Sequence, residues 1–445
     1  MTAGAGADIH VVRGEGGAVR VTAGPAFGHG RAYDDMTTAG ADFTRSVLDV
    51  AGAVLFWPVL EGPVLPVAEI HDVVRAQQWL WAVYGERVAV AVHTVAAEAQ
   101  DSLPVRRPTG RPTALANAAA RLSFGHWAAR WWPASYTDGI PALEPDVLGL
   151  ELAALTHQCQ QLFDGSDDID DQPDDCVAEL VGEHSGALEP LIQWWRAQPQ
   201  PSDTAQRLGS VLRLIDDAAG CAGLDGPALR RLRSASDQEQ NRSGTGPAAG
   251  TPVDPGALFA RQGGYALAAG DPPVAGGRVI ARGSGTNDWS RYPPGFVDAA
   301  EDAVSWTVRA LGARRQIEVG AVAHVAAPAD AGIPLVAEVK VNGRRPNRVA
   351  LARRDDVWTG RGRLDPASAT DLSATAPPRI EVGVLLPGFD PGPGAGGRVD
   401  RDAIRALARR RLADAAQPPL YDVYDMCSGP FLAEILAAAA TSEDY

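Results

Sequence analysis

The stretch Val-Ser-Trp-Thr-Val-Arg-Ala at residues 304–310 alternates apolar and polar side chains at every position. Neighbouring side chains of a β-strand point to opposite faces, so this period of two predicts a strand with one buried face. Residues 317–323 and 380–384 alternate similarly, and Asn342-Gly343 is typical of a two-residue hairpin turn, which needs positive φ at both positions. We therefore predict about seven short strands that form an antiparallel, immunoglobulin-like β-sandwich over residues 276–390.

Upstream of this region the apolar residues follow a helical period. The clearest case is a set spaced 4, 3, 4 and 3 positions apart, namely Leu148, Leu152, Leu155, Cys159 and Leu162. This spacing predicts one apolar face of an amphipathic helix. Residues 177–195 and 208–215 show the same pattern, with a kink expected at Pro190. Short connections between such helices favour a small helical bundle over residues 112–233.

The first 104 residues are expected to form a small α/β unit. Residues 53–57 and 88–93 are apolar runs without alternation, which is typical of strands covered on both faces. Between them, residues 69–84 carry apolar side chains at helical spacing, and Gly85 is placed to end that helix. The pattern predicts one β-α-β unit.

The whole chain is therefore predicted to be an α+β protein with several domains. Segments rich in Pro, Gly and Ser separate the regions with helical or strand periodicity, and we interpret these segments as linkers. The predicted parts are the α/β unit (1–104), the helical bundle (112–233), a linker (234–275), the β-sandwich (276–390) and C-terminal helices (398–445).

The composition disfavours nucleic acid as a partner. The 445 residues carry a formal net charge of −15, which repels phosphate backbones unless basic residues gather on one face. The best local candidate is the set Arg401, Arg405 and Arg409 at i, i+4 spacing, which we interpret as a solvated helix face. Alanine and arginine are abundant and Lys340 is the single lysine, which indicates a GC-rich, actinobacterial genome.

The sequence gives no indication of secretion or membrane insertion. Its four cysteines are too few and too scattered for a disulfide framework in a chain of this length. No stretch reaches about 18 uninterrupted apolar residues, and residues 1–8 lack the basic start of a secretory leader. We therefore expect a cytoplasmic protein without membrane association.

Common catalytic motifs are absent from the sequence. A phosphate-binding P-loop needs a lysine after its glycines, but Lys340 lies in a predicted strand, and neither His-Glu-x-x-His nor Gly-x-Ser-x-Gly occurs. Gly24, Gly28 and Gly30 follow an extended run, but no apolar helix opens behind them. The acidic segment 164–175 resembles a calcium loop in part, yet it lacks the required glycine and final glutamate. We predict no catalytic residue and no cofactor.

Four residues carry atoms that bind zinc, but in the wrong arrangement. His157, Cys159, Cys176 and His184 match the spacing of no common structural zinc site. Cys159 and His184 also fall on apolar faces of predicted helices. We therefore expect both to be core residues and predict no metal site.

Two pairs of adjacent tryptophans stand out in the helical region, Trp131 with Trp132 and Trp194 with Trp195. Neighbouring residues on a helix diverge by about 100°, so both members of a pair cannot enter one core. One indole of each pair is expected near the surface, where aromatic side chains are enriched in protein interfaces. We predict that these four residues contribute to a protein-binding surface.

Two segments carry a resemblance to known proteins. One is Arg130-Trp-Trp-Pro-Ala-Ser with the following Asp138-Gly-Ile-Pro-Ala-Leu, and the other is Asp288-Trp-Ser-Arg-Tyr-Pro-Pro-Gly continuing to Trp306. Both resemble stretches of uncharacterised actinobacterial proteins associated with MoxR-type AAA+ ATPases and von Willebrand A proteins in conflict gene clusters. The resemblance covers less than a tenth of the chain and implies an accessory subunit.

Two hypotheses about function follow. The first is a non-enzymatic adaptor that binds a protein partner, with a AAA+ ATPase or a von Willebrand A protein implied by the resemblance. The alternative is an enzyme or ligand-binding protein that uses the N-terminal α/β unit, where His29, His71, Asp72 and His93 are the available titratable groups. A cleft in which these side chains converge would favour the alternative, and a flat aromatic patch would favour the adaptor.

Overall fold

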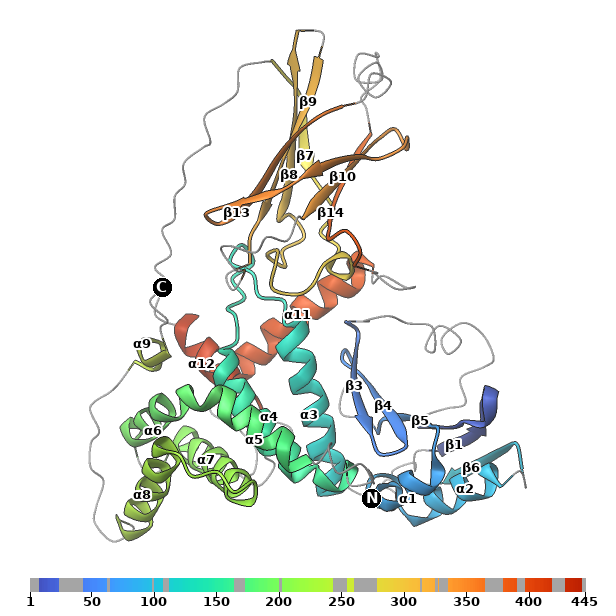
Figure 1. Ribbon diagram of the computed structural model, residues 1–445, viewed down its shortest axis with the longest axis vertical. Coiled ribbons are helices and arrows are strands. Elements are labelled where there is room, and N and C mark those ends of the chain that lie inside the picture. Colours follow the sequence, from blue (N-terminus) through green and yellow to red (C-terminus); the bar gives the residue numbers. More distant parts are fainter. Residues whose placement is uncertain are drawn as a thin grey trace, which may run out of the picture.

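Helices and antiparallel sheets together make this an α+β protein. One sheet lies near the N-terminus, helices occupy the middle of the chain, and two further sheets follow (Figure 1). The computed structural model describes residues 8–23, 43–61, 65–97, 100–106, 112–163, 173–199, 202–242, 254–259, 278–312, 314–324, 327, 335–364, 379–389, 397–417 and 429–441.

The N-terminal sheet has the strand order β3-β4-β5-β2-β1-β6, and all of its pairings are antiparallel. Its strands are β1 (Asp8–Arg13), β2 (Val19–Ala23), β3 (Arg45–Val50), β4 (Ala53–Pro58), β5 (Val67–Ile70) and β6 (Ser102–Arg106). In β4 fully buried side chains alternate with partly buried ones, so one face of the sheet belongs to the core. Helices pack on a sheet whose pairings are all antiparallel, so the predicted β-α-β unit is wrong.

The predicted strand at residues 88–93 is wrong, because these residues lie in helix α2 (Glu86–Ala96). Gly85, with φ of 93°, ends α1 (Val73–Tyr84) and also precedes the first residue of α2. The buried side chains of α2 include Val88, Val92 and Val95, which share one helix face. A short apolar run is compatible with a strand or a buried helix, and only packing against the sheet decides between them.

Six longer helices form the middle of the chain, and they are α3 (Ala114–Trp131), α4 (Pro145–Gln158), α5 (Pro173–His184), α6 (Leu188–Ala197), α7 (Asp203–Cys221) and α8 (Pro227–Arg242). The predicted apolar stripe from Leu148 to Leu162 is buried throughout. Helix α4 is, however, buried around most of its circumference because α3, α5 and α7 all pack against it. It is the central helix of this part.

Two expectations about helix ends need correction. Residues 177–195 do not form one kinked helix, since a short 3₁₀ turn over Ser185–Ala187 separates α5 from α6. Pro190 then lies in the first turn of α6, where a missing N–H costs nothing. The expected linker over 234–275 is helical at both described stretches, because α8 continues to Arg242 and α9 spans Pro255–Phe259.

The described part of residues 276–390 forms two antiparallel sheets. A five-stranded sheet has the order β12-β13-β9-β8-β7, and a three-stranded sheet has the order β11-β10-β14. The strands are β7 (Arg278–Ser284), β8 (Val304–Leu311), β9 (Arg314–Val322), β10 (Val336–Val341), β11 (Asn347–Ala350), β12 (Ala352–Arg354), β13 (Val357–Arg363) and β14 (Ile380–Leu385). Asn342 and Gly343 have φ of 49° and 70°, which confirms the predicted turn.

Two helices close the described chain, α11 (Arg398–Ala416) and α12 (Leu432–Thr441). Helix α11 crosses between the C-terminal sheets and the middle helices, and α12 packs on α11 and α4 (Figure 1). The start of α12 is anchored by buried charges, because Glu151 of α4 accepts the N–H of Leu432 at 2.6 Å and Arg121 of α3 donates to the carbonyl of Gly429. The chain therefore returns to the core of its helical part.

Candidate functional site

The first member of each tryptophan pair is a core residue. Trp131 and Trp194 are 7% and 2% exposed, whereas Trp132 and Trp195 are partly buried. The indole of Trp132 donates to the carbonyl of Pro141 at 2.9 Å, and that of Trp195 lies over Gly209 of α7. The expectation that one indole of each pair lies near the surface therefore points to Trp132 and Trp195, and both also pack against the chain.

Trp131 belongs to an aromatic cluster that joins distant parts of the chain. The ring of Phe43, just before β3, lies 6.2 Å from that of Trp131 and 5.2 Å from that of Trp289. Trp289 follows β7, so the cluster connects the N-terminal sheet, α3 and the C-terminal sheets. Trp131 has a structural role in this position.

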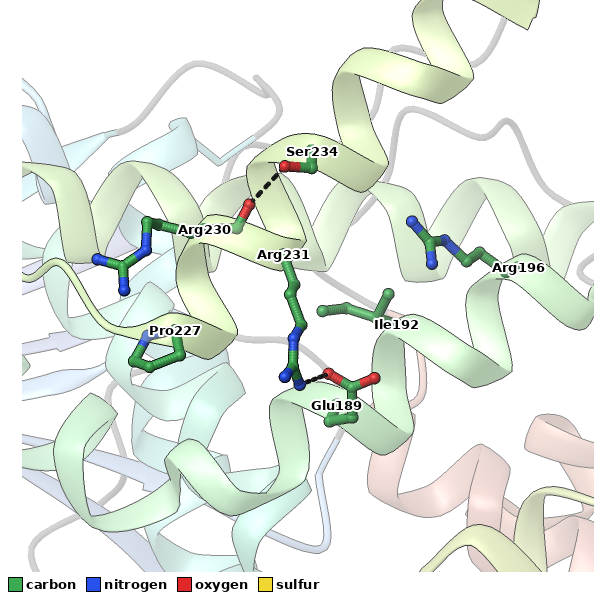
Figure 2. A pocket seen from close by; sticks show the side chains of 7 residues that line it. All are labelled: Glu189, Ile192, Arg196, Pro227, Arg230, Arg231 and Ser234. Atoms are coloured by element: carbon green, nitrogen blue, oxygen red, sulfur yellow. Dashed lines mark hydrogen bonds and ion pairs between the residues drawn. The ribbon is translucent and has the colours of Figure 1, made fainter.

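A shallow groove of about 350 Å³ lies between α8 and α6, the helix that carries the second pair. Its lining residues are Glu189, Ile192, Arg196, Pro227, Arg230, Arg231 and Ser234 (Figure 2). The side chains of Arg196 and Arg230 lie on opposite sides of Arg231 (Figure 2). Arg231 pairs with Glu189 at 2.7 Å, so the three arginines do not converge on one ligand position.

Two segments remote in sequence, residues 130–143 and 288–306, meet in the structure. The N–H of Ala299 donates to the carbonyl of Ala134 at 3.2 Å, and the N–H of Tyr136 donates to Asp298 Oδ2 at 2.8 Å. These contacts join the turn after α3 to the loop before β8. We call this contact region the junction, and it includes residues 134–138, residues 287–301 and the face of α11 that covers them.

The arginines of α11 at the junction are paired, and two of the three are buried. Arg401 and Arg405 are 3% and 4% exposed, so the predicted solvated helix face is wrong. Arg401 donates two hydrogen bonds to Glu301 at 2.8 and 3.0 Å, and Arg405 donates to the carbonyl of Ala299 at 2.9 Å. Arg409 lies 3.2 Å from Asp138. Burial of these guanidinium groups is tolerated because carboxylates and carbonyls satisfy them.

The carboxylate of Glu301 is held in its charged form. Burial alone would raise its pKa, but hydrogen bonds and charge from Arg401, with the further charge of Arg405, lower the pKa below its ordinary value. The same pairing raises the pKa of Arg401 despite its burial. The junction is therefore held by an ion pair that stays charged at neutral pH.

Neutral polar groups complete the junction. Asn287 is fully buried, and its amide donates to the carbonyls of Asp298 at 2.8 Å and Ala300 at 2.6 Å. The hydroxyl of Tyr292 donates to Asn287 Oδ1, and burial raises the pKa of Tyr292 well above its ordinary value. These groups satisfy one another, so the segment before β8 is an internal connection of the protein.

The groups considered for an enzyme do not form a parallel-sheet site. Every pairing among the described strands of the N-terminal sheet is antiparallel, so the switch point expected of a parallel α/β sheet is missing there. Asp72 caps α1, since its carboxylate accepts the N–H groups of Val74 and Arg75. His71 and His93 are exposed, and His29 lies outside the described residues with Gly24, Gly28, Gly30 and residues 164–172.

The zinc-type residues are dispersed across the middle helices. Cys159 is fully buried, Cys176 is exposed, and His184 Nδ1 lies 3.0 Å from Asp146 Oδ1 with its ring against Gly149. His157 is partly buried at the end of α4. Within the described ranges, no group of three or more His, Cys, Asp or Glu side chains is arranged to hold a metal ion.

Among the described tryptophans, the most exposed one is not a member of either tryptophan pair and was not predicted as a binding residue. Trp81 on α1 is 56% exposed, and Val74, one helical heptad earlier, is 83% exposed. Val90 on the adjacent α2 is also exposed. Val74 and Trp81 share a helix face, opposite the one that carries the buried Ala76, Leu80 and Val83. We call this surface the α1 face. In the sequence, two apolar residues seven positions apart and outside the buried face of this helix are the signal that could have identified the α1 face.

Comparisons with protein-family models, with curated proteins and with solved structures find no match. Among the helices that the structure describes, none has both the length and the apolar character needed to span a bilayer.

Proposed function

We propose that this protein is a non-enzymatic adaptor that binds another protein through the α1 face. The observation that carries the proposal is the exposure of Val74 and Trp81 on one side of a helix that is otherwise well packed. Large exposed apolar side chains that share a surface are a solubility liability unless a partner covers them. A partner with an apolar groove fits this face, since an amphipathic helix docks by residues at i and i+7.

The α1 face is held on a firm support. Trp79 of the same helix is fully buried, and its indole donates to the carbonyl of Ala51 at 2.9 Å. Tyr84 at the helix end donates its hydroxyl to the carbonyl of Pro66 at 2.9 Å. A partner that binds Trp81 therefore meets a preorganised surface, which reduces the entropy lost on binding. Trp132 and Trp195, the partly buried members of the tryptophan pairs, are secondary contacts in this proposal.

The C-terminal half would present a second unit to the assembly. We infer an immunoglobulin-like sandwich from the way its two sheets approach each other. A Cβ atom built on Gly360 of β13 would lie 2.4 Å from the carbonyl of Ala350 and 3.0 Å from Val349 of β11. Only glycine permits this close approach, and side chains from both sheets enter the same core. The junction then fixes this sandwich relative to the α1 face.

The biological setting belongs to the proposal as well. We place the adaptor in the cytoplasm, as an accessory subunit in a bacterial conflict system. A MoxR-type AAA+ ATPase or a von Willebrand A protein is the partner class implied by the resemblance of residues 130–143 and 288–306. These two segments, remote in sequence, lie against each other at the junction.

The proposal is tested by affinity purification of the tagged full chain from its native cell. Trp81→Gln should remove a specific protein that accompanies the wild type and leave the melting temperature unchanged, because the side chain is exposed. Val399→Gln on α11 is the matched control, since Val399 is 79% exposed but lies on another element. Trp132→Phe and Trp195→Phe test the secondary contacts. Recovery of the same proteins with Trp81→Gln as with Val399→Gln would contradict the proposal.

A further inference from the structure

Charge is unevenly distributed along the chain. Residues 278–389 contain 15 of the 40 basic residues but only 12 of the 55 acidic ones. This segment is therefore net positive, although the chain as a whole has a net charge of −15. The remaining residues carry the entire acidic excess.

The strand register gathers much of this positive charge on one side of the five-stranded sheet. In β8 the side chains of Val304, Trp306 and Val308 are buried, so Thr307 and Arg309 point outward. The register pairs Thr307 with Arg282 and Glu318, and Glu318 with Arg361. It also pairs Arg309 with Gln316, and Gln316 with Arg363. The outward face, with Arg314 at its end, is called the basic sheet face, and its arginines are Arg282, Arg309, Arg314, Arg361 and Arg363.

One carboxylate stands among these five arginines, and two of them share it. Glu318 accepts two hydrogen bonds from Arg361 at 2.7 and 2.9 Å, and Arg309 lies 4.0 Å from the other oxygen. In the part of the chain that the structure describes, the guanidinium groups of Arg282, Arg314 and Arg363 form no ion pair. The face therefore keeps uncompensated positive charge.

Exposed aliphatic side chains are interleaved with the arginines. Val279 is 45% exposed and lies opposite Arg309 in the strand register. Leu311 is 38% exposed and lies opposite Arg314. None of the outward positions on these described strands carries an aromatic ring. Phosphates are bound by charged and polar groups, and sites for single strands typically add aromatic rings on which bases stack, so the exposed aliphatic side chains favour a protein partner.

We propose that the basic sheet face binds an acidic protein surface that also carries aliphatic side chains. Arginine is enriched in protein interfaces, and a positive patch on an otherwise acidic chain selects partners of opposite charge. The aliphatic residues give such a partner contacts that do not depend on salt. This inference rests on the proposed adaptor function, because it supplies the adaptor with a second surface, remote from the α1 face.

The test uses the full chain and fluorescent polymers as probes. Poly-L-glutamate, a glutamate–leucine copolymer and a DNA duplex of equal total charge are titrated in low salt by anisotropy. The triple variant Arg282→Gln, Arg314→Gln, Arg363→Gln should bind poly-L-glutamate at least about tenfold more weakly. The control is Arg345→Gln, Arg348→Gln, Arg379→Gln, which makes the same charge change at the three-stranded sheet and should leave the affinity unchanged.

The aliphatic part of the proposal has its own comparison. The wild type should bind the glutamate–leucine copolymer more tightly than poly-L-glutamate. The double variant Val279→Ser, Leu311→Ser should bind both polymers with equal affinity and keep the wild-type melting temperature.

Four results would overturn the proposal. The first is absence of binding to poly-L-glutamate, and the second is an equal loss of affinity in the two triple variants. The third is DNA binding that is as tight as poly-L-glutamate binding and is lost when the same arginines are replaced. The fourth is self-association, measured by sedimentation, that only the first triple variant abolishes. The proposed function is tested separately at Trp81, which these variants leave intact, so the two failures are distinguishable.

Discussion

At the scale of single residues, the partners of a side chain decide what it does. Arg401 and Arg405 are buried against Glu301 and Ala299 and hold two parts of the chain together. Arg282 and Arg363 are the same residue type on an exposed sheet and are available to a partner. The two sets of arginines cannot be told apart in the sequence, because Glu301 and Ala299, which hold Arg401 and Arg405 in the core, lie about 100 residues away.

Trp306 tests burial at this scale. It is 9% exposed, its indole donates to the carbonyl of Ser284 at 3.0 Å, and its ring lies against Gly283. Trp306→Ala should lower the free energy of unfolding by about 3 kcal/mol or more, as truncation of large buried aromatics does. Chemical denaturation measures this, and Val279→Ala at an exposed position is the control. A loss below about 1 kcal/mol would place Trp306 outside the core.

At the scale of elements, β13 can lie close to β11 because residue 360 is a glycine. A methyl group on Gly360 would meet the carbonyl of Ala350 and the side chains of Val349 and Leu351. The polypeptide backbone cannot yield as a side chain can, so the strands would have to separate. This contact is the structural basis for the inferred sandwich.

Gly360→Ala should therefore destabilise the protein by about 1–3 kcal/mol, the usual cost of overpacking a core. Gly320→Ala on the neighbouring β9 is the control, because a Cβ atom there would meet Ser305 Oγ at an ordinary 3.4 Å. Thermal unfolding of the two variants gives the comparison. Equal melting temperatures would mean that the sheets do not pack together at Gly360.

Elements that depend on local chemistry could be predicted from the sequence. The Asn342-Gly343 turn and the end of α1 at Gly85 follow from the conformations that these residues allow. The helical identity of residues 88–93 could not be predicted, because their apolar run fits either a strand or a buried helix. The basic sheet face also required the structure, since it arises from the register of four strands.

At the scale of the whole molecule, the junction fixes the C-terminal sheets relative to the helices. Its ion pairs depend on pH because the pKa of Glu301 is lowered in the folded protein. A carboxylate with a lowered pKa stabilises the fold above its ordinary pKa, and this stabilisation is lost as the pH falls through the folded value. The junction should therefore weaken in acid and be fully formed at neutral pH.

Glu301→Gln is expected to reproduce this loss at neutral pH. Removing one partner of a largely buried ion pair leaves Arg401 uncompensated, so the free energy of unfolding should fall by about 2 kcal/mol or more. The stability difference between wild type and variant should shrink as the pH is lowered. Small-angle scattering should show a larger radius of gyration for the variant if the sheets are released. A constant difference at every pH would exclude Glu301 as the titrating group.

For the candidate site, the sequence predicts surface tryptophans but not which tryptophan is the most exposed. Adjacent tryptophans indicate that one indole of each pair lies nearer the surface, and Trp132 and Trp195 take that position. Tertiary packing then covers both of them in part, through Pro141 and Gly209. Trp81 is more exposed than either, because its indole donates to the carbonyl of Gln78 on the same helix and 56% of the side chain stays exposed. Such differences depend on contacts between elements, which periodicity within one element does not contain.

The central claim, that the chain acts by binding a protein at the α1 face, is tested most directly by titration calorimetry. The protein that accompanies the wild type is purified and titrated against wild type, Trp81→Gln and Val399→Gln. The account predicts a Kd at least about thirtyfold higher for Trp81→Gln, as for a central interface aromatic, and an unchanged Kd for Val399→Gln. Equal affinity of all three proteins for that partner would contradict it.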